Sequence, residues 1–316
     1  MIFIRRPQTN PFFNIAAEEH FLKNSREDML MLWQSEPSVV VGKHQNVMAE
    51  VNMDFVRENN IPVIRRISGG GMVYHDLGNI NLTQISSSRK TDQLIDFHKF
   101  TQPVIDFLKQ FGLEASFEGK NNLTVNGKKF SGNSAHVFKN KVIHHGTLLY
   151  DTDLDRLEKV IHPGNSRIVD KSIKSIRATV RNIADYLENP VTTETFRQRL
   201  ELFLKDYYHM STTVDITPEE QQAIEKLVEE KYTRWMWNMG YSPKYSIRQE
   251  RDTEYGKFNV ALEVKEGKIT NIQLIFEGKP LEKIEQSLLG QKHDKIHLQK
   301  VMVNNRFSEV IINTLF

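Results

Sequence analysis

The chain has 316 residues, which is enough for one large domain or for a large domain with a smaller one. Its side chains are 39% hydrophobic and 26% charged, an ordinary composition for a soluble protein with a substantial core. The formal net charge of +2 argues against a dedicated nucleic-acid binder, and the absence of cysteine excludes disulfides, zinc–thiolate sites and thioester-forming nucleophiles.

The beginning of the chain, Met1–Gln8, lacks the apolar stretch that is typical of a signal peptide. No run in the sequence approaches the roughly 18 apolar residues that a membrane-spanning helix requires. We therefore expect a cytoplasmic protein that binds neither membrane nor nucleic acid.

The first part of the sequence predicts one helix and several short strands. Residues 13–24 have helical character, and Asn10 and Pro11 lie just ahead as start signals. Apolar runs separated by glycines or turns then predict strands at residues 29–33, 38–43, 63–68, 71–75 and 80–86.

The middle of the chain predicts a helix followed by two hairpins. Apolar residues at helical spacing cover 104–111 and end at Gly112, a common residue just beyond a helix. Pro103 is either a first-turn residue of this helix or a kink in a helix that began earlier. Residues 122–150 have a strand pattern, with one hairpin turn at Asn126-Gly127 and a second around residue 140.

The last third predicts helices and then a change of character. Residues 192–239 look helical, and Thr217 to Glu220 form a capping box with proline at the first helical position. After a linker at Tyr241–Ser246, with a domain boundary expected near Tyr241–Lys244, strands are predicted at 258–264 and 269–276 around a Glu-Gly turn. Two short helices are expected to close the chain.

Three successive glycines, Gly69–Gly71, form the most informative segment and follow Arg65 and Arg66. Glycines allow positive φ and close approach to a ligand, and the N–H groups of such a turn can surround an anion. The arginine adds a donor fork for phosphate or carboxylate. The segment is neither a Walker A loop nor a dinucleotide fingerprint. A purely structural turn is the alternative, which the two arginines and the following His75-Asp76 make less favoured.

A second cationic segment, residues 119–141, contains five lysines and no carboxylate. Such a run is often the solvated face of a hairpin. Alternation along a strand would put Lys129 opposite Phe130, so Lys129 faces solvent or a cleft if Phe130 is in the core. The adjacent His144 and His145 would point to opposite faces, which favours structural or site-lining roles over a shared metal ion.

Five segments occur in an order that is more specific than any one of them: FNIAAEE, VGKHQN, RRISGGGMVYHDLGNIN, KFSG and HHGTLL, which start at residues 13, 41, 65, 129 and 144. Together they resemble the lipoate–protein ligase A family of the biotin/lipoate ligase superfamily. The resemblance implies an α+β fold. A mixed β-sheet catalytic domain, similar to class II synthetase cores, would cover 1–242, and a small α/β accessory domain would cover 246–316.

The resemblance also implies a reaction. ATP and lipoate would give lipoyl-AMP and pyrophosphate, and a lysine of an acceptor protein would then attack the mixed anhydride. Lys129 matches the family's catalytic lysine, which bridges the acyl carbonyl and the phosphate. The other expected binding positions are Lys43, Arg66, Ser68, Gly70, Gly71, Met72, Val73, Tyr74, His75, Asn79 and Asn122. Of these, His75 is expected near the dithiolane end of the ligand, and Ala17 and Trp33 are candidates for its apolar slot.

One position departs from the family pattern, because Asn122 stands where a carboxylate thought to help hold magnesium or adenylate is common. An amide oxygen can still coordinate Mg²⁺ but brings no charge. Mg²⁺ is expected with ATP, held mostly by phosphates and water, with no dedicated protein metal site. This departure leaves an alternative open, a lipoyltransferase that uses preformed lipoyl-AMP.

The implied acceptors are lipoyl domains of 2-oxoacid dehydrogenase E2 subunits and the glycine-cleavage H protein, with lipoate or octanoate as acyl group. Octanoyltransferases of the carrier-dependent or relay type need a cysteine, which this chain lacks. A biotin ligase would have a GRGRRG-type loop. A non-catalytic binding protein would not need Lys129 at the adenylate.

Overall fold

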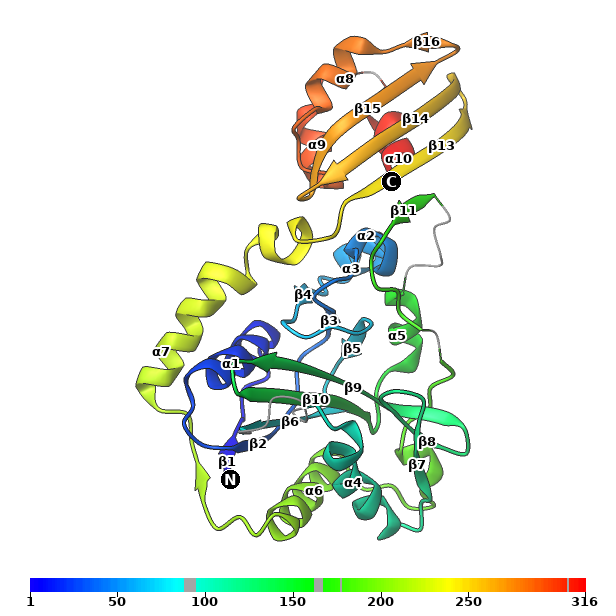
Figure 1. Cartoon of the computed structure of the whole chain (residues 1–316). Helices are drawn as coiled ribbons and strands as arrows, with labels where there is room; N and C mark the ends of the chain where they lie inside the picture. Colours follow the sequence, from blue (N-terminus) through cyan, green and yellow to red (C-terminus); the bar gives the residue numbers. More distant parts are fainter. Residues whose placement is uncertain (88–94, 162–166, 177, 306) are drawn as a thin grey trace. The chain divides into compact units, whose positions relative to one another are not determined.

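The computed structural model describes residues 1–87, 95–161, 167–176, 178–305 and 307–316 (Figure 1). The chain divides into two compact units, and neither is continuous in sequence. The first unit consists of Met1–Lys43, Asn52–Ile161 and Ser175–Arg234. The second consists of His44–Val51, the described residues within 162–174, and Trp235–Phe316.

A mixed sheet forms the centre of the first unit. Within the described residues its strand order is β12 (Thr213–Val214), β1 (Ile2–Arg5), β2 (Met29–Trp33), β6 (Asn79–Ser87), β10 (Lys141–Leu149), β9 (Lys128–Phe138), β8 (Asn122–Val125) and β7 (Ala115–Glu118). β1 is parallel to β12 and β2, and the other pairs are antiparallel. The strands predicted at 29–33 and 80–86 and the two predicted hairpins are all part of this sheet.

The two faces of this sheet have different partners. On one face, alternate apolar side chains of the strands pack with α4 (Phe97–Lys109) and α6 (Thr193–Tyr207) into the main hydrophobic core (Figure 1). Phe107 and Phe196 meet there edge to face, with ring centroids 5.2 Å apart. The opposite face of β6 and β10 packs against α1 (Pro11–Asn24). The site described below lies on this second face.

The helices of the first unit begin at residues that the sequence indicates. Asn10 caps α1, and its side chain accepts a hydrogen bond from the Phe13 N–H. The predicted capping box of Thr217 and Glu220 is present at the start of α7 (Pro218–Leu227). Pro103 lies inside α4, so it is not a first-turn residue and the helix begins earlier, at Phe97.

A small three-stranded sheet, β4 (Val63–Arg65), β3 (Ser38–Val41) and β5 (Val73–His75), carries the glycine turn between β4 and β5. The remaining elements of the first unit are α3 (Met53–Glu58), α5 (Leu154–Val160), η2 (Ala184–Tyr186) and the π-helical turn η3 (Val228–Tyr232).

The second unit has its own antiparallel sheet and its own core. The strand order in the described residues is β11 (Ile168–Asp170), β13 (Tyr245–Thr253), β14 (Gly256–Lys265), β15 (Lys268–Phe276) and β16 (Lys279–Pro280). The helical elements are α2 (Val47–Glu50), η4 (Met236–Gly240), α8 (Glu282–Leu288), α9 (Lys295–Val301) and α10 (Ser308–Leu315). Buried side chains of the sheet and of the last three helices form one cluster.

The α+β prediction is confirmed, and three details of the last third are wrong. The region predicted to be helical, 192–239, contains strand β12 between α6 and α7. Strand β13 is absent from the prediction, because only Tyr245 and Ile247 in it are buried and the rest of its sequence is largely polar. Three short helices close the chain instead of two. No helix in the described ranges is long and apolar enough to cross a membrane.

Candidate active site

The Arg66 guanidinium donates hydrogen bonds to the backbone carbonyls of the glycine turn. One terminal nitrogen of Arg66 donates to the carbonyl oxygens of Gly69 (2.6 Å) and Gly71 (2.7 Å), and the other donates to Val40 O (3.1 Å). Its Nε donates to Ser68 Oγ (2.9 Å). Burial lowers the pKa of Arg66 to about 10, so it remains charged at neutral pH. In this structure the arginine fork therefore shapes the turn.

The turn keeps its amide hydrogens available. Among the residues that the structure describes, none accepts a hydrogen bond from the N–H of Gly69, Gly70 or Gly71, all three of which are half-buried. The Gly69 carbonyl accepts a second bond from Ser134 Oγ (2.9 Å), and Gly70 adopts a φ of +83°. Unpaired amides in a glycine turn with positive φ are the elements of an anion-binding nest.

Lys129 lies on β9 with its side chain on the face opposite to the core. The neighbouring Phe130 is fully buried, as alternation along the strand predicts. The Lys129 ammonium lies beside Gly132, where a Cβ would be 3.0 Å from the Nζ atom. Its backbone pairs with Thr179 O (2.9 Å) and Arg181 N (3.0 Å). Burial lowers the pKa of the Lys129 ammonium below its ordinary value.

The glycine turn and the Lys129 ammonium lie along the same face of β9. The register shift between Leu123 and Thr124 leaves Phe130 as an extra residue in β9, so the alternation reverses after it and Gly132 returns to the side of Lys129. Ser134, two residues further on, points to the same side. The Lys129 Nζ lies beside Gly132, and Ser134 donates to Gly69. Asn122 is the ladder partner of Gly132 on β8. The structure thus brings together three of the predicted features: the turn, the lysine and the amide.

Residues just after the turn are fixed by two separate contacts. The Met72 N–H donates to Ser175 Oγ (3.0 Å), and a Cβ at Gly71 would also meet Ser175. Val73 and Tyr74 belong to β5 and pair with β3; the first is half-buried and the second is buried. The neighbourhood of Ser175 was not predicted from the sequence, because no motif marks it.

The VGKHQN segment lies directly against the turn. A Cβ at Gly42 would be only 2.0 Å from the Gly70 carbonyl oxygen, and the Lys43 N–H donates to Ser68 O (2.8 Å). Burial, and next the charge of Lys43, lower the pKa of His136 on β9. The Lys43 backbone thus contacts the residue just before the three glycines.

A buried chain of hydrogen bonds connects Arg66 and Ser68, next to the turn, with α1 and β2. In order, its members are Trp33, Thr83, Glu18, His145, Ser68 and Arg66, all of them buried. Trp33 Nε1 donates to Thr83 Oγ1 (2.9 Å), which lies 2.5 Å from Glu18 Oε1. Glu18 Oε2 lies 2.9 Å from His145 Nδ1, and His145 Nε2 lies 2.6 Å from Ser68 Oγ.

Glu18 was not singled out from the sequence, and His145 was given only a structural or site-lining role. The available signals were a pair of glutamates in an otherwise apolar helix and the two adjacent histidines. The histidines do face opposite sides, because His144 stacks on Phe100 in the main core, with ring centroids 5.3 Å apart. His145 lies on the other face, level with Thr83 and Ser134 in the strand register.

Two of the residues expected around the lipoyl chain form a buried aromatic pair. Trp33 and His75 meet edge to face, with ring centroids 5.6 Å apart, and Ala17 is fully buried. Burial lowers the pKa of His75 to about 3, so its imidazole is neutral, and its Nδ1 has no partner among the described residues. Asn79, another expected binding position, is fully buried and donates to Asn81 Oδ1 (3.1 Å).

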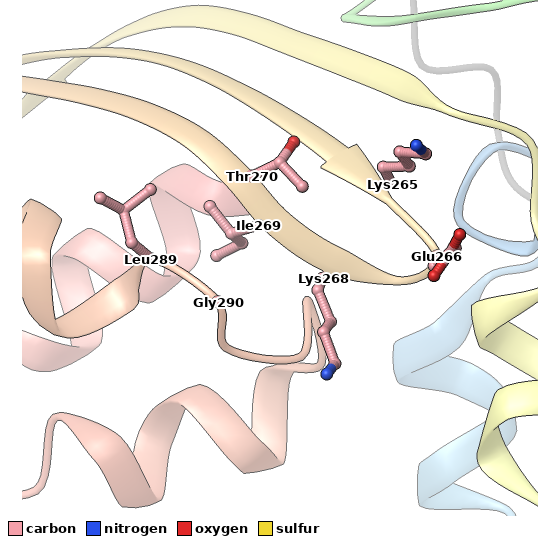
Figure 2. Close-up of a pocket in the computed structure, with 7 residues that line it drawn as sticks. All are labelled: Lys265, Glu266, Lys268, Ile269, Thr270, Leu289 and Gly290. Atoms are coloured by element: carbon pink, nitrogen blue, oxygen red, sulfur yellow. The ribbon is translucent and has the colours of Figure 1, made fainter.

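A metal-binding cluster is absent from the described residues, and a surface pocket in the second unit is not a second polar site. In the described ranges, no group of three or more histidine, aspartate or glutamate side chains could hold a metal ion. A surface pocket in the second unit, shown in Figure 2, is lined mainly by apolar surface. Its charged side chains, Lys265, Glu266 and Lys268, point in different directions, so no polar groups converge there.

Comparison with known proteins covers both parts of the chain. The model of the family described as "Lipoyl protein ligase A/B catalytic domain" matches residues 10–205. The model described as "Bacterial lipoate protein ligase C-terminus" matches residues 242–315.

Individual relatives match over most of their own length. The chain is 36% identical over 310 residues to the lipoate-protein ligase LplJ of Bacillus subtilis, covering 96% of this chain and 93% of that one. A bi-partite lipoate protein ligase of Thermoplasma acidophilum has a TM-score of 0.65 at 26% identity, covering 76% of this chain and 96% of that one. A structure of lipoate-protein ligase A bound with ATP also has a TM-score of 0.65 at 26% identity, with coverage of 76% and 98%.

Proposed function

Since this chain belongs to the lipoyl protein ligase A/B family, we propose that its site carries out both steps of an ATP-dependent lipoylation. The chain is a lipoate–protein ligase. In the first step, a lipoate carboxylate oxygen attacks the α-phosphorus of ATP, the bond to the β-phosphate oxygen breaks, and pyrophosphate leaves. In the second, a lysine amine of the acceptor attacks the acyl carbon, the bond to AMP breaks, and the amine loses a proton.

One observation carries this proposal: the unpaired amides of the glycine turn and the Lys129 ammonium lie along one face of β9. Amides at Gly69, Gly70 and Gly71 suit the acyl carboxylate and the α-phosphate, because they offer donors at no cost in reorganisation. A lysine suits a position that must serve two oxygen centres in succession, because its ammonium is a compact charge on a flexible stem.

The lipoyl chain is proposed to occupy the slot near Trp33, His75 and Ala17. A neutral imidazole and an indole suit an apolar ligand, because neither brings a charge into the slot. The acyl carboxylate would then lie at the turn.

Magnesium is proposed to enter with the ATP phosphates and to neutralise part of their charge. The donors fit this limited role. Asn122 offers an amide oxygen beside Gly132, and the described residues contain no carboxylate cluster that would hold the ion without nucleotide.

The acceptor is proposed to be a lipoyl domain, in the E2 subunits of 2-oxoacid dehydrogenases or in the glycine-cleavage H protein. A solved relative was studied together with its E2 lipoyl domain. We also propose a cytoplasmic location, with residues 1–242 as the catalytic domain and 246–316 as the accessory domain.

Mass spectrometry of an apo-lipoyl domain after incubation with this protein tests the proposal. With ATP and Mg²⁺, we expect a mass increase from lipoate and none from biotin, and an octanoate reaction reports the acyl preference. A parallel reaction supplies lipoyl-AMP without ATP. Product from lipoyl-AMP but not from free lipoate would contradict the activating step and favour a lipoyltransferase. No product in either reaction would contradict the proposed function.

A further inference from the structure

The buried chain from Trp33 to Arg66 has a direction that its members impose. An indole N–H can only donate, so the Thr83 oxygen accepts from Trp33, and the Thr83 proton is directed to Glu18. An ionised carboxylate can only accept. The Glu18 side chain therefore accepts from Thr83 at one oxygen and from His145 Nδ1 at the other.

Glu18 is buried, yet its surroundings favour the ionised form. Burial by itself raises the pKa of Glu18, but His145, Thr83 and Arg6 together outweigh burial and leave that pKa below its ordinary value. An ionised Glu18 accepts the proton on His145 Nδ1, which leaves Nε2 as the ring atom that faces the Ser68 hydroxyl. Ser68 then donates to Nε2 and accepts from Arg66 Nε, so each member of the chain has a partner.

We propose that Glu18 is a positioning residue for lipoyl-AMP formation, acting through His145 and Ser68 on the arginine that shapes the glycine turn. Arg66 holds the carbonyls of Gly69 and Gly71, so its orientation decides where the turn's amides point. Glu18 does not itself contact the turn. This inference rests on the proposed function.

The other Glu18 oxygen starts a second series of hydrogen bonds, which leads toward the predicted lipoyl slot. Through Thr83, Glu18 holds the Trp33 indole, which packs against His75. The two series therefore have separable effects. Loss of the Ser68 link disturbs the turn and lowers kcat, whereas loss of the Thr83 link loosens Trp33 and raises KM for lipoate.

Lipoyl-AMP formation from ATP and lipoate separates these effects in purified full-length variants. We expect Ser68→Ala to lower kcat about ten- to hundredfold, by analogy with the loss seen when the hydrogen-bond partners of metal ligands are removed. We expect Thr83→Val, which preserves shape, to raise KM for lipoate with little change in kcat, and Glu18→Gln to do both. Glu19→Gln is the matched control. Glu19 is the next buried carboxylate on α1 and binds Lys23, Lys231 and Tyr232, none of which belongs to the hydrogen-bond series of Glu18. This control variant is expected to have a lower melting temperature but unchanged kcat and KM.

Folded Glu18→Gln and Ser68→Ala variants with wild-type kcat would overturn the proposal. A second measurement needs no variant. In the ¹⁵N spectrum of histidine-labelled protein, His145 is expected to carry its proton on Nδ1, and a proton found only on Nε2 would overturn the assigned direction. If wild-type protein formed no lipoyl-AMP, the proposed function would fail, while the tautomer would still report on the hydrogen-bond chain.

Discussion

Lys129 is the residue on which the proposed chemistry depends most directly. We expect Lys129→Ala to lower lipoyl-AMP formation and transfer by about 10²–10³, the usual cost of removing one donor from a developing charge. The fold should persist, because the side chain lies on the half-exposed face of β9 while Phe130 fills the core. Mass spectrometry of the acceptor and a thermal melt measure both effects. A Lys129→Ala protein that lipoylates at the normal rate would disprove the assignment.

The same lysine predicts a pH dependence. Burial lowers the pKa of the Lys129 ammonium from its ordinary value of 10.5. The cation is present below that lowered pKa and is lost as pH rises through it, so kcat/KM for ATP should decline at a lower pH than an exposed lysine would cause. In Lys129→Arg the guanidinium stays charged, and the decline should move to higher pH whatever the absolute rate. An identical pH profile for both proteins would exclude Lys129 as its source.

Single residues differ in how far the sequence predicted them. The glycine turn and Lys129 stand in short motifs whose residue types indicate their chemistry. Glu18 does not, because its partners Thr83 and His145 are 65 and 127 residues away in sequence. Pairs of that separation become visible only when the strand register brings α1, β6 and β10 together.

At the scale of elements, the close approach of two loops makes glycine necessary at position 42. A methyl group there would overlap the Gly70 carbonyl oxygen at 2.0 Å. We expect Gly42→Ala to push the turn out of place, lowering the melting temperature and raising KM for ATP. Gly69→Ala is a matched control for stability, since a Cβ at Gly69 meets nothing within 4 Å and no positive φ is required. Equal melting temperatures for the two variants would contradict this explanation.

Elements with local turn signals were predicted well, and elements defined by distant pairing were not. The Asn126-Gly127 turn has positive φ at both residues, as the dipeptide predicts. β13 was missed because most of its side chains face solvent, and its pairing with β11 and β14 supplies what its apolar pattern lacks. The number of closing helices was wrong because each is only seven or eight residues long.

At the scale of the whole molecule, two segments that precede residue 175 complete the second unit. β11 pairs with β13, Asn46 donates to Asp170 (2.9 Å), and the Val47 N–H contacts Ser242 Oγ (3.4 Å). A linear boundary near residues 241–244 could be predicted from composition. This exchange of segments could not, because residues 44–51 show no composition that separates them from their neighbours.

Ending the chain after residue 242 should therefore disturb segments that remain in the shortened protein. β11 and α2 would lose the sheet on which they pack, and α2 follows closely after Lys43. We expect this shortened chain to lose lipoyl-AMP formation while it still transfers the acyl group from supplied lipoyl-AMP. The transfer reaction is the internal control for folding. Normal activation by the shortened chain would contradict any role of residues 246–316 in that step.

Because the second unit is discontinuous in sequence, its parts are synthesised at different times. Residues 44–51 leave the ribosome early, but the strands that complete their unit are made last, since β13 begins only at Tyr245. Until these strands are made, residues 44–51 lack the sheet of their own unit, although the segments on both sides of them belong to the first unit. A chain released before residue 245 would therefore leave residues 44–51 without the strands that complete their unit.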